Sequence, residues 1–159
     1  MSRAMLLVML VVLLALAAPA AFAASDITVT VTLAQVGVDV SPTSWALGTM
    51  APGASQETTS RHFTATNSGN VAEDLTIAVG ASTPSGWDPA AASGVDEYRM
   101  GVTTDAIPDQ ALTPSYTLAS SVAAAGTVGF DLKFTAPAAG STYNAGGETI
   151  TVSLSASAS

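Results

Sequence analysis

A polar tetrapeptide between two alternating segments is the feature that most constrains how this chain folds. Residues 67–70 read Asn-Ser-Gly-Asn, and both Asn and Gly tolerate the positive φ angles that tight connections require. Apolar residues alternate with polar ones on either side, in residues 63–66 and 71–79. A period of two places one face of a strand in a core and the other in solvent. The sequence therefore predicts a β-hairpin here, with its two strands paired.

The same alternation recurs along most of the chain and indicates about seven to nine short strands. The strongest is 127–135, where Phe130 and Phe134 are expected to face inward and Asp131 and Lys133 outward. The other expected strands are 25–33, 36–40, 57–66, 71–79, 97–102 and 148–155, with short apolar steps at 45–47 and 116–118. No helical period follows residue 23. This spacing is typical of an all-β, antiparallel, two-sheet sandwich.

The apolar face changes parity near residues 34–37. Before this point the apolar residues occupy odd positions, namely Ile27, Val29, Val31 and Leu33. After it they occupy even positions, namely Val36, Val38 and Val40. A slip of one residue inverts every side chain of a strand. We therefore expect a bulge, or a crossing from one sheet to the other, between Ala34 and Gly37.

Met1 to Ala23 has the organisation of a secretory signal peptide. Arg3 gives a positive start, residues 5–16 are apolar and uncharged, and Ala21-Phe22-Ala23 supplies small residues before a cleavage site. We expect a signal-peptide helix at 1–23, cleavage after Ala23 and one domain over 24–159. The alternative is a retained membrane anchor, although the apolar run is shorter than the roughly 20 residues that span a bilayer.

The charge balance excludes two classes of partner. The whole chain has a net charge of −8, and removing the leader leaves three basic residues against twelve acidic ones. Three dispersed cations are too few for binding to a nucleic acid or to anionic lipid, so we expect no nucleic-acid partner and no membrane association after leader removal. The chain has no cysteine, which excludes disulfides and thiolate metal sites.

Catalytic chemistry is not indicated. His62 is the single histidine, and its parity places it on the outward face of a strand. A Ser-His-Asp triad would have to use it, yet no G-x-S-x-G elbow is present. We therefore expect a protein that is not an enzyme, with no catalytic residue and no cofactor.

Two further sets of side chains leave alternatives open. Acidic residues in or beside loops are interpreted as solvated, with a calcium site as the alternative, although no D-x-D-x-D-G loop occurs; they are Asp88, Asp96, Glu97, Asp105 and Asp109. Trp45 and Trp87 are expected to fill the core, with stacking on a sugar as the alternative. Tyr143, in a Gly-rich loop, is expected to be the most exposed aromatic residue.

The motifs around the tetrapeptide resemble those of a known family. Trp45-Ala46-Leu47-Gly48-Thr49, then Ala51-Pro52-Gly53, then residues 63–70 (FTATNSGN) are similar to prokaryotic immunoglobulin-like domains of the Hydin-type and α-galactosidase-associated groups. The resemblance covers most of residues 24–159 and implies an Ig-like sandwich, without implying any catalytic residue. One such module behind a leader is similar to secreted TasA-like filament subunits of prokaryotes.

These observations predict a secreted structural subunit of an extracellular filament or surface layer. Residues 24–35 would form a donor strand, in which Ile27, Val29, Val31 and Leu33 fill pockets on a second copy of the chain. The expected partner is therefore the protein itself. The alternative is a secreted Ig-like binding module for a polysaccharide, such as a surface glycan, or for another protein.

Overall fold

A computed structural model describes residues 28–113 and 115–159. The chain divides into two units, Met1–Thr32 and Leu33–Ser159. In the first unit the described residues, 28–32, form no helix or strand. The expected signal peptide and Ile27 lie outside the described residues. Within the described residues, no helix is long and apolar enough to cross a membrane.

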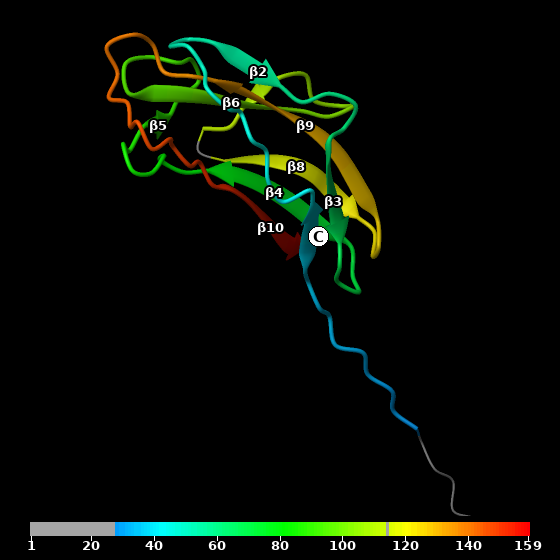
Figure 1. Cartoon of the computed structure of the whole chain (residues 1–159). Helices are drawn as coiled ribbons and strands as arrows, with labels where there is room; N and C mark the ends of the chain where they lie inside the picture. Colours follow the sequence, from blue (N-terminus) through cyan, green and yellow to red (C-terminus); the bar gives the residue numbers. More distant parts are fainter. Residues whose placement is uncertain (1–27, 114) are drawn as a thin grey trace, which may run out of the picture. The chain divides into compact units, whose positions relative to one another are not determined.

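The second unit is built of β-strands, and its described residues contain no helix, which confirms the all-β prediction (Figure 1). The described residues form ten strands, several of them only two or three residues long. In chain order they are β1 (Val38–Ser41), β2 (Ser55–Glu57), β3 (Phe63–Asn67), β4 (Glu73–Val79), β5 (Asp88–Pro89), β6 (Glu97–Thr103), β7 (Gln110–Ala111), β8 (Ser115–Val122), β9 (Thr127–Thr135) and β10 (Val152–Ala158).

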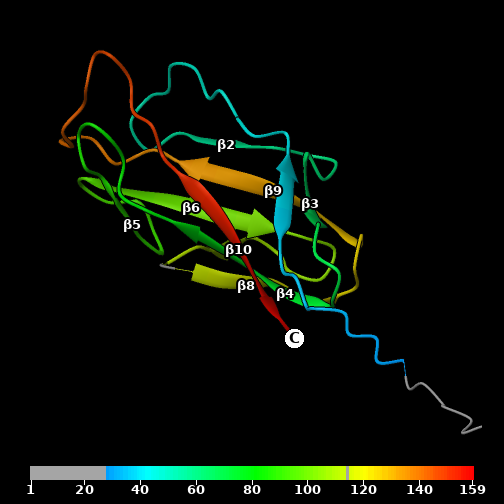
Figure 2. The same cartoon turned by 90° about the horizontal axis from the view of Figure 1, so that it is seen from below.

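The strands form two sheets. The larger has the order β1-β3-β9-β6-β5, with β2 joined to β9 and β7 joined to β6. The smaller has the order β10-β4-β8, so β10 and β8 are its edges. Figure 2 shows β10 lying across the same side of the unit as β1. The pairings are antiparallel except for the short parallel contact of β5 with β6, which the sequence analysis did not anticipate.

The predicted hairpin is wrong in its pairing. β3 pairs with β1 and β9, whereas β4 pairs with β10 and β8, so the two strands belong to different sheets. The turn at 67–70 therefore crosses between the sheets. Both strands have alternate residues fully buried, and the crossing brings their apolar faces together across the core. A hairpin would have placed those side chains side by side on one face of a single sheet.

Asn67 holds this crossing together. Its side chain is 1% exposed, and its amide donates hydrogen bonds to the carbonyl oxygens of Val71 and Val122, each at 2.8 Å. Its side-chain oxygen accepts a hydrogen bond from the backbone N–H of Gly69. Buried carbonyl groups need such partners. One amide side chain thus satisfies the backbone of the turn and of β8.

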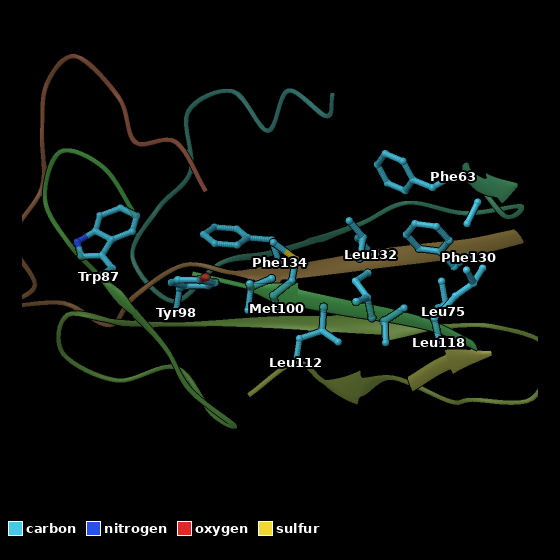
Figure 3. Close-up of a cluster of buried hydrophobic side chains, with 14 of the residues drawn as sticks. Phe63, Leu75, Trp87, Tyr98, Met100, Leu112, Leu118, Phe130, Leu132 and Phe134 are labelled. Atoms are coloured by element: carbon cyan, nitrogen blue, oxygen red, sulfur yellow. The ribbon is translucent and has the colours of Figure 1, made fainter. Parts of the chain in front are cut away.

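The core lies between the sheets and is closed by aromatic and aliphatic side chains (Figure 3). Phe130 stacks on Phe63 with ring centroids 5.4 Å apart, and the ring centroids of Tyr98 and Phe134 are 5.8 Å apart. Burial, together with the charge of Asp88, raises the pKa of Tyr98 to about 12. The buried positions of Phe63, Phe130 and Phe134 confirm the expected inward faces of β3 and β9.

Asp131 was expected to be exposed and is instead buried. Its neighbours Phe130 and Leu132 face the core, so it lies on the opposite face of β9. The loop before β3 covers it there. Ser60 and Arg61 both have positive φ, and the backbone N–H groups of Arg61 and His62 converge on the carboxylate at 2.9 and 3.0 Å. Consecutive N–H groups arranged in this way form a concave anion site.

Candidate assembly site

The segment that leads into β1 is exposed and belongs to no strand. Residues 28–37 form no strand, so the expected strand at 25–33 is absent over its described part. Its apolar side chains are unusually open to solvent, with exposed fractions of 85% for Val29, 79% for Val31 and 79% for Leu33. Three large aliphatic residues at alternate positions make one continuous apolar edge, which soluble proteins seldom expose without a partner.

The base of this segment is fixed to the crossing turn. Asn70 donates a hydrogen bond from its side chain to the Leu33 carbonyl at 2.9 Å and accepts one from the Gln35 N–H at 2.7 Å. The Asn70 N–H in turn donates to the Gln35 carbonyl at 3.0 Å. The Gly37 N–H donates to Glu73 at 2.8 Å. The bulge or sheet crossing predicted between Ala34 and Gly37 is not formed, because residues 28–37 are in no strand and β1 begins just after them.

An open groove of about 840 Å³ lies between the sheets on the β10 side. Its floor is made by buried aromatic residues of the core, among them Phe63, Phe130 and Phe134. Its walls are apolar residues that are only half-buried, namely Val40, Trp45, Leu47, Met50, Ile150, Val152 and Leu154. The core is thus tightly covered beneath β4 and β6, and incompletely covered beside β10.

Glu148 stands at this groove with its carboxylate tied to a neighbouring turn. Its Oε2 accepts hydrogen bonds from the Ser82 hydroxyl at 2.9 Å and the Ser85 N–H at 3.0 Å. Burial acts to raise the pKa of Glu148, but the hydrogen bonds from Ser85 and Ser82 outweigh it and lower that pKa. The carboxylate therefore ties the end of the Gly-rich loop, residues 140–147, to the turn at residues 82–85.

The aromatic residues singled out from the sequence are divided between core and groove. Trp87 is buried, and its indole N–H donates to the carbonyl of Thr142, so core filling is confirmed for it. Trp45 is half-buried and lines the groove. Tyr143 is 47% exposed and meets the edge of Trp87 with ring centroids 5.7 Å apart. These rings form no row of exposed platforms among the described residues.

The five acidic residues proposed as an alternative calcium site do not form one cluster: Asp88 lies opposite Glu97 in the β5–β6 pairing and next to Asp96, whereas Asp105 and Asp109 pair with different arginines. Asp105 pairs with Arg61 at 2.6 Å, and Asp109 pairs with Arg99 at 2.8 Å. Asp96 accepts a hydrogen bond from the Thr142 N–H. In the part of the chain that the structure describes, no three His, Asp or Glu side chains gather in a way that could hold a metal ion.

His62 faces solvent, as its parity predicted, and its ring packs edge-on against Phe63 at 4.8 Å. Its backbone N–H is engaged by Asp131. The side chain therefore lies outside the groove, away from the apolar lining described above.

The groove itself was missed by sequence reasoning. A usable signal was present in the segment 42–50, where Trp45 and Leu47 are separated from any regular strand by Pro42 and Gly48. Such a segment covers a core loosely because its backbone is not held by a sheet. Comparison of the chain with protein-family models, with characterised proteins and with solved structures finds no match.

Proposed function

We propose that this protein is a secreted structural subunit, built as an Ig-like sandwich, of an extracellular filament or surface layer. The observation that supports this most directly is the exposed alternation of Val29, Val31 and Leu33 in a segment that belongs to no strand. Burial of one such side chain contributes about 1.5–3 kcal/mol. An extended segment with three of them gains most by becoming a strand on another molecule, because backbone hydrogen bonds then form as well.

The polar side of the segment fits the same role. Thr28, Thr30 and Thr32 alternate with the apolar residues and are also exposed. Threonine has a high preference for strands and tolerates solvent. The segment therefore has one face suited to a core and one suited to an outer surface once it pairs.

Assembly of the secreted chain, residues 24–159, tests this function. We expect it to form fibres or sheets that are visible by negative-stain microscopy and that sediment at high concentration. A chain that begins at Val36 should stay unassembled, and Val29→Asp should impair assembly more than Thr30→Asp on the opposite face. Strict monomers at every concentration would contradict the proposal.

A second function, a secreted binding module for a polysaccharide or a protein, has one observation in its favour. Trp45 and Tyr143 line the groove together with polar groups of Asn144 and Glu148. Sugars are bound by such combinations of aromatic and polar side chains. Binding of monomeric protein on a glycan array, lost in Tyr143→Ala and kept in Val29→Asp, would favour this function over assembly.

A further inference from the structure

We propose that the free edge of β10, together with the groove beside it, is the acceptor for residues 28–33 of a second copy of the chain. The inference rests on the proposed function and adds to it the acceptor surface on the partner copy. Three sets of observations support it: the condition of each sheet edge, the unfilled side of the core, and the match between the two segments.

The edges of the two sheets differ in how well they are protected against pairing. β8 is irregular, with register shifts opposite Leu75 and a positive φ of 52° at Ser121. β1 is four residues long, carries Asp39 and is followed by Pro42. β5 and β7 have two residues each, one of them Pro89, and β2 has three. Bulges, charges, prolines and short length are the usual means by which proteins prevent a further strand from joining an edge.

β10 carries none of these features, and β1, which approaches it in the same chain, does not pair with it. It is seven residues long, reads VSLSASA, and contains no charge and no proline. It pairs with β4 in unbroken register from Val152 to Ala158. An edge strand that is long, regular and uncharged is a template for another strand. Among the described strands at sheet edges, β10 is therefore the one best suited to accept a partner.

The groove shows which side chains the acceptor lacks and a partner strand must supply. The inward residues of β10 that line it, Val152 and Leu154, remain only half-buried. Across the groove, Val40 and Leu47 are also only half-buried. A strand added beside β10 would place alternate side chains over these residues, because neighbouring strands lie about 4.8 Å apart with their side chains in register. The added side chains must be apolar on one face.

Residues 28–33 match this requirement in pattern and length. Their apolar face consists of Val29, Val31 and Leu33, and the described segment has six residues against the seven of β10. Their polar face of threonines would continue the exposed serines of β10, Ser153, Ser155 and Ser157. The combined sheet would then be apolar toward the groove and hydroxyl-bearing toward solvent. Neither segment introduces a charge into the contact.

Cysteine cross-linking tests the contact, because the native chain has no cysteine and each introduced thiol reports one position. Secreted chains with Thr30→Cys are mixed with chains carrying Ser153→Cys, Ser155→Cys or Ser157→Cys and are then oxidised. All four positions are exposed, so the substitutions leave the core intact. Strand neighbours directly opposite each other have Cβ atoms within reach of a disulfide. We expect a disulfide that joins the two different chains, identified by its mass and lost on reduction, in at least one of the three mixtures.

Two matched variants address the competing edges. Thr117→Cys on β8 and Ser41→Cys on β1, which keeps the charge of Asp39, are also exposed positions, and each variant is mixed with Thr30→Cys in the same way. Cross-linking at either of these positions and at none on β10 would overturn the inference while leaving the assembly function intact. Fibres that form without any cross-link to β10 would likewise overturn the inference and leave the assembly function intact.

Two further outcomes separate the inference from the function on which it rests. If neither fibres nor cross-links form at any concentration, the proposed function fails together with the acceptor. A chain carrying both Thr30→Cys and Ser155→Cys should form no internal disulfide when it is exposed to oxidant at high dilution. A disulfide within that dilute monomer would show that the segment folds back onto its own β10, which would overturn donation to a second copy.

Discussion

Glu73 accepts a hydrogen bond at 2.8 Å from the backbone N–H of Gly37, and this contact joins the base of the exposed segment to the first residue of β4. Glu73 is fully buried, and its Oε2 has no hydrogen-bond partner among the described residues. A buried carboxylate is costly unless it is hydrogen-bonded. The one hydrogen bond that Glu73 accepts here holds the backbone at Gly37. The position of residues 33–37 therefore depends on a few close contacts.

Gly69→Ala is expected to disturb this junction. A Cβ at Gly69 would overlap Oε1 of Glu73 and the carbonyl oxygen of Gln35, so the backbone must shift. We expect a loss of about 1–3 kcal/mol in unfolding free energy. The amides of Gly37 and Asn70 should exchange hydrogen faster, because both donate within the junction.

Gly80→Ala is the matched control for that substitution. A Cβ at Gly80 meets nothing within 4 Å, and its φ is not positive. We expect its stability in a urea melt and its amide exchange to match those of the native chain. Equal effects of the two substitutions would contradict the tight packing assigned to Gly69.

Phe130→Ala is expected to lower the unfolding free energy by about 3–5 kcal/mol, because it leaves a cavity beside Phe63. Lys133→Ala on the same strand removes partly exposed ion pairs with Glu57 and Asp109 at 3.9 and 3.5 Å. Exposed ion pairs contribute about 0–1 kcal/mol. Urea melts of both variants give the comparison, and equal losses would contradict the inward assignment of Phe130.

Asn67→Ala is expected to cost about 1–3 kcal/mol, because the carbonyls of Val71 and Val122 would lose their buried donor. Asn144→Ala is the control. Asn144 donates a side-chain hydrogen bond to the Gly147 carbonyl and accepts one from the Gly146 N–H, but in an exposed turn. Asn144→Ala should therefore change the midpoint temperature of unfolding little. A small effect at Asn67 would show that the crossing turn is held by its backbone alone.

Asp131 should make stability depend on pH in the acid range. Burial acts to raise its pKa, but hydrogen bonds from His62, Arg61 and Thr58 and the charge of Arg61 outweigh burial and lower the pKa. A carboxyl whose pKa is lowered by folding stabilises the protein at pH values above its pKa in the unfolded state, which is about 3.9. That contribution is lost as pH falls through the lower folded value.

The measurement compares native protein with Asp131→Asn in urea melts from neutral pH down to about pH 2. The difference in unfolding free energy should be largest at neutral pH and should shrink at low pH. Asp105→Asn is the control, because the side chain of Asp105 is 96% exposed and its ion pair with Arg61 contributes little. A difference that does not change with pH would contradict the ionised state assigned to Asp131.

Alternation in the sequence predicted the faces of β3, β4, β6 and β9 correctly, because core and solvent impose that pattern directly on each strand. It could not predict which strands are neighbours. Phe63 and Ile77 are apolar for the same reason whether their strands share a sheet or face each other across the core. The turn at 67–70 is compatible with both arrangements, and only the pairing of β4 with β8 and β10 distinguishes them.

The sequence could not predict the burial of Asp131 or the open groove, and the reason is similar in both cases. Both depend on irregular segments, 58–62 in one case and 42–50 in the other. The position of such a segment is set by contacts made after the sheets have formed. The exposure of Val29 and Val31 also could not be read from alternation, because a strand on its own sheet and a strand awaiting a partner have the same pattern.

All three cations of the described residues, Arg61, Arg99 and Lys133, are already engaged in ion pairs within the chain. The twelve acidic residues exceed them by nine. Two copies that approach each other therefore repel, and the repulsion extends about 30 Å at 0.01 M ionic strength but only about 8 Å at 0.15 M. Added salt should accelerate association of this protein, whereas it weakens contacts between opposite charges.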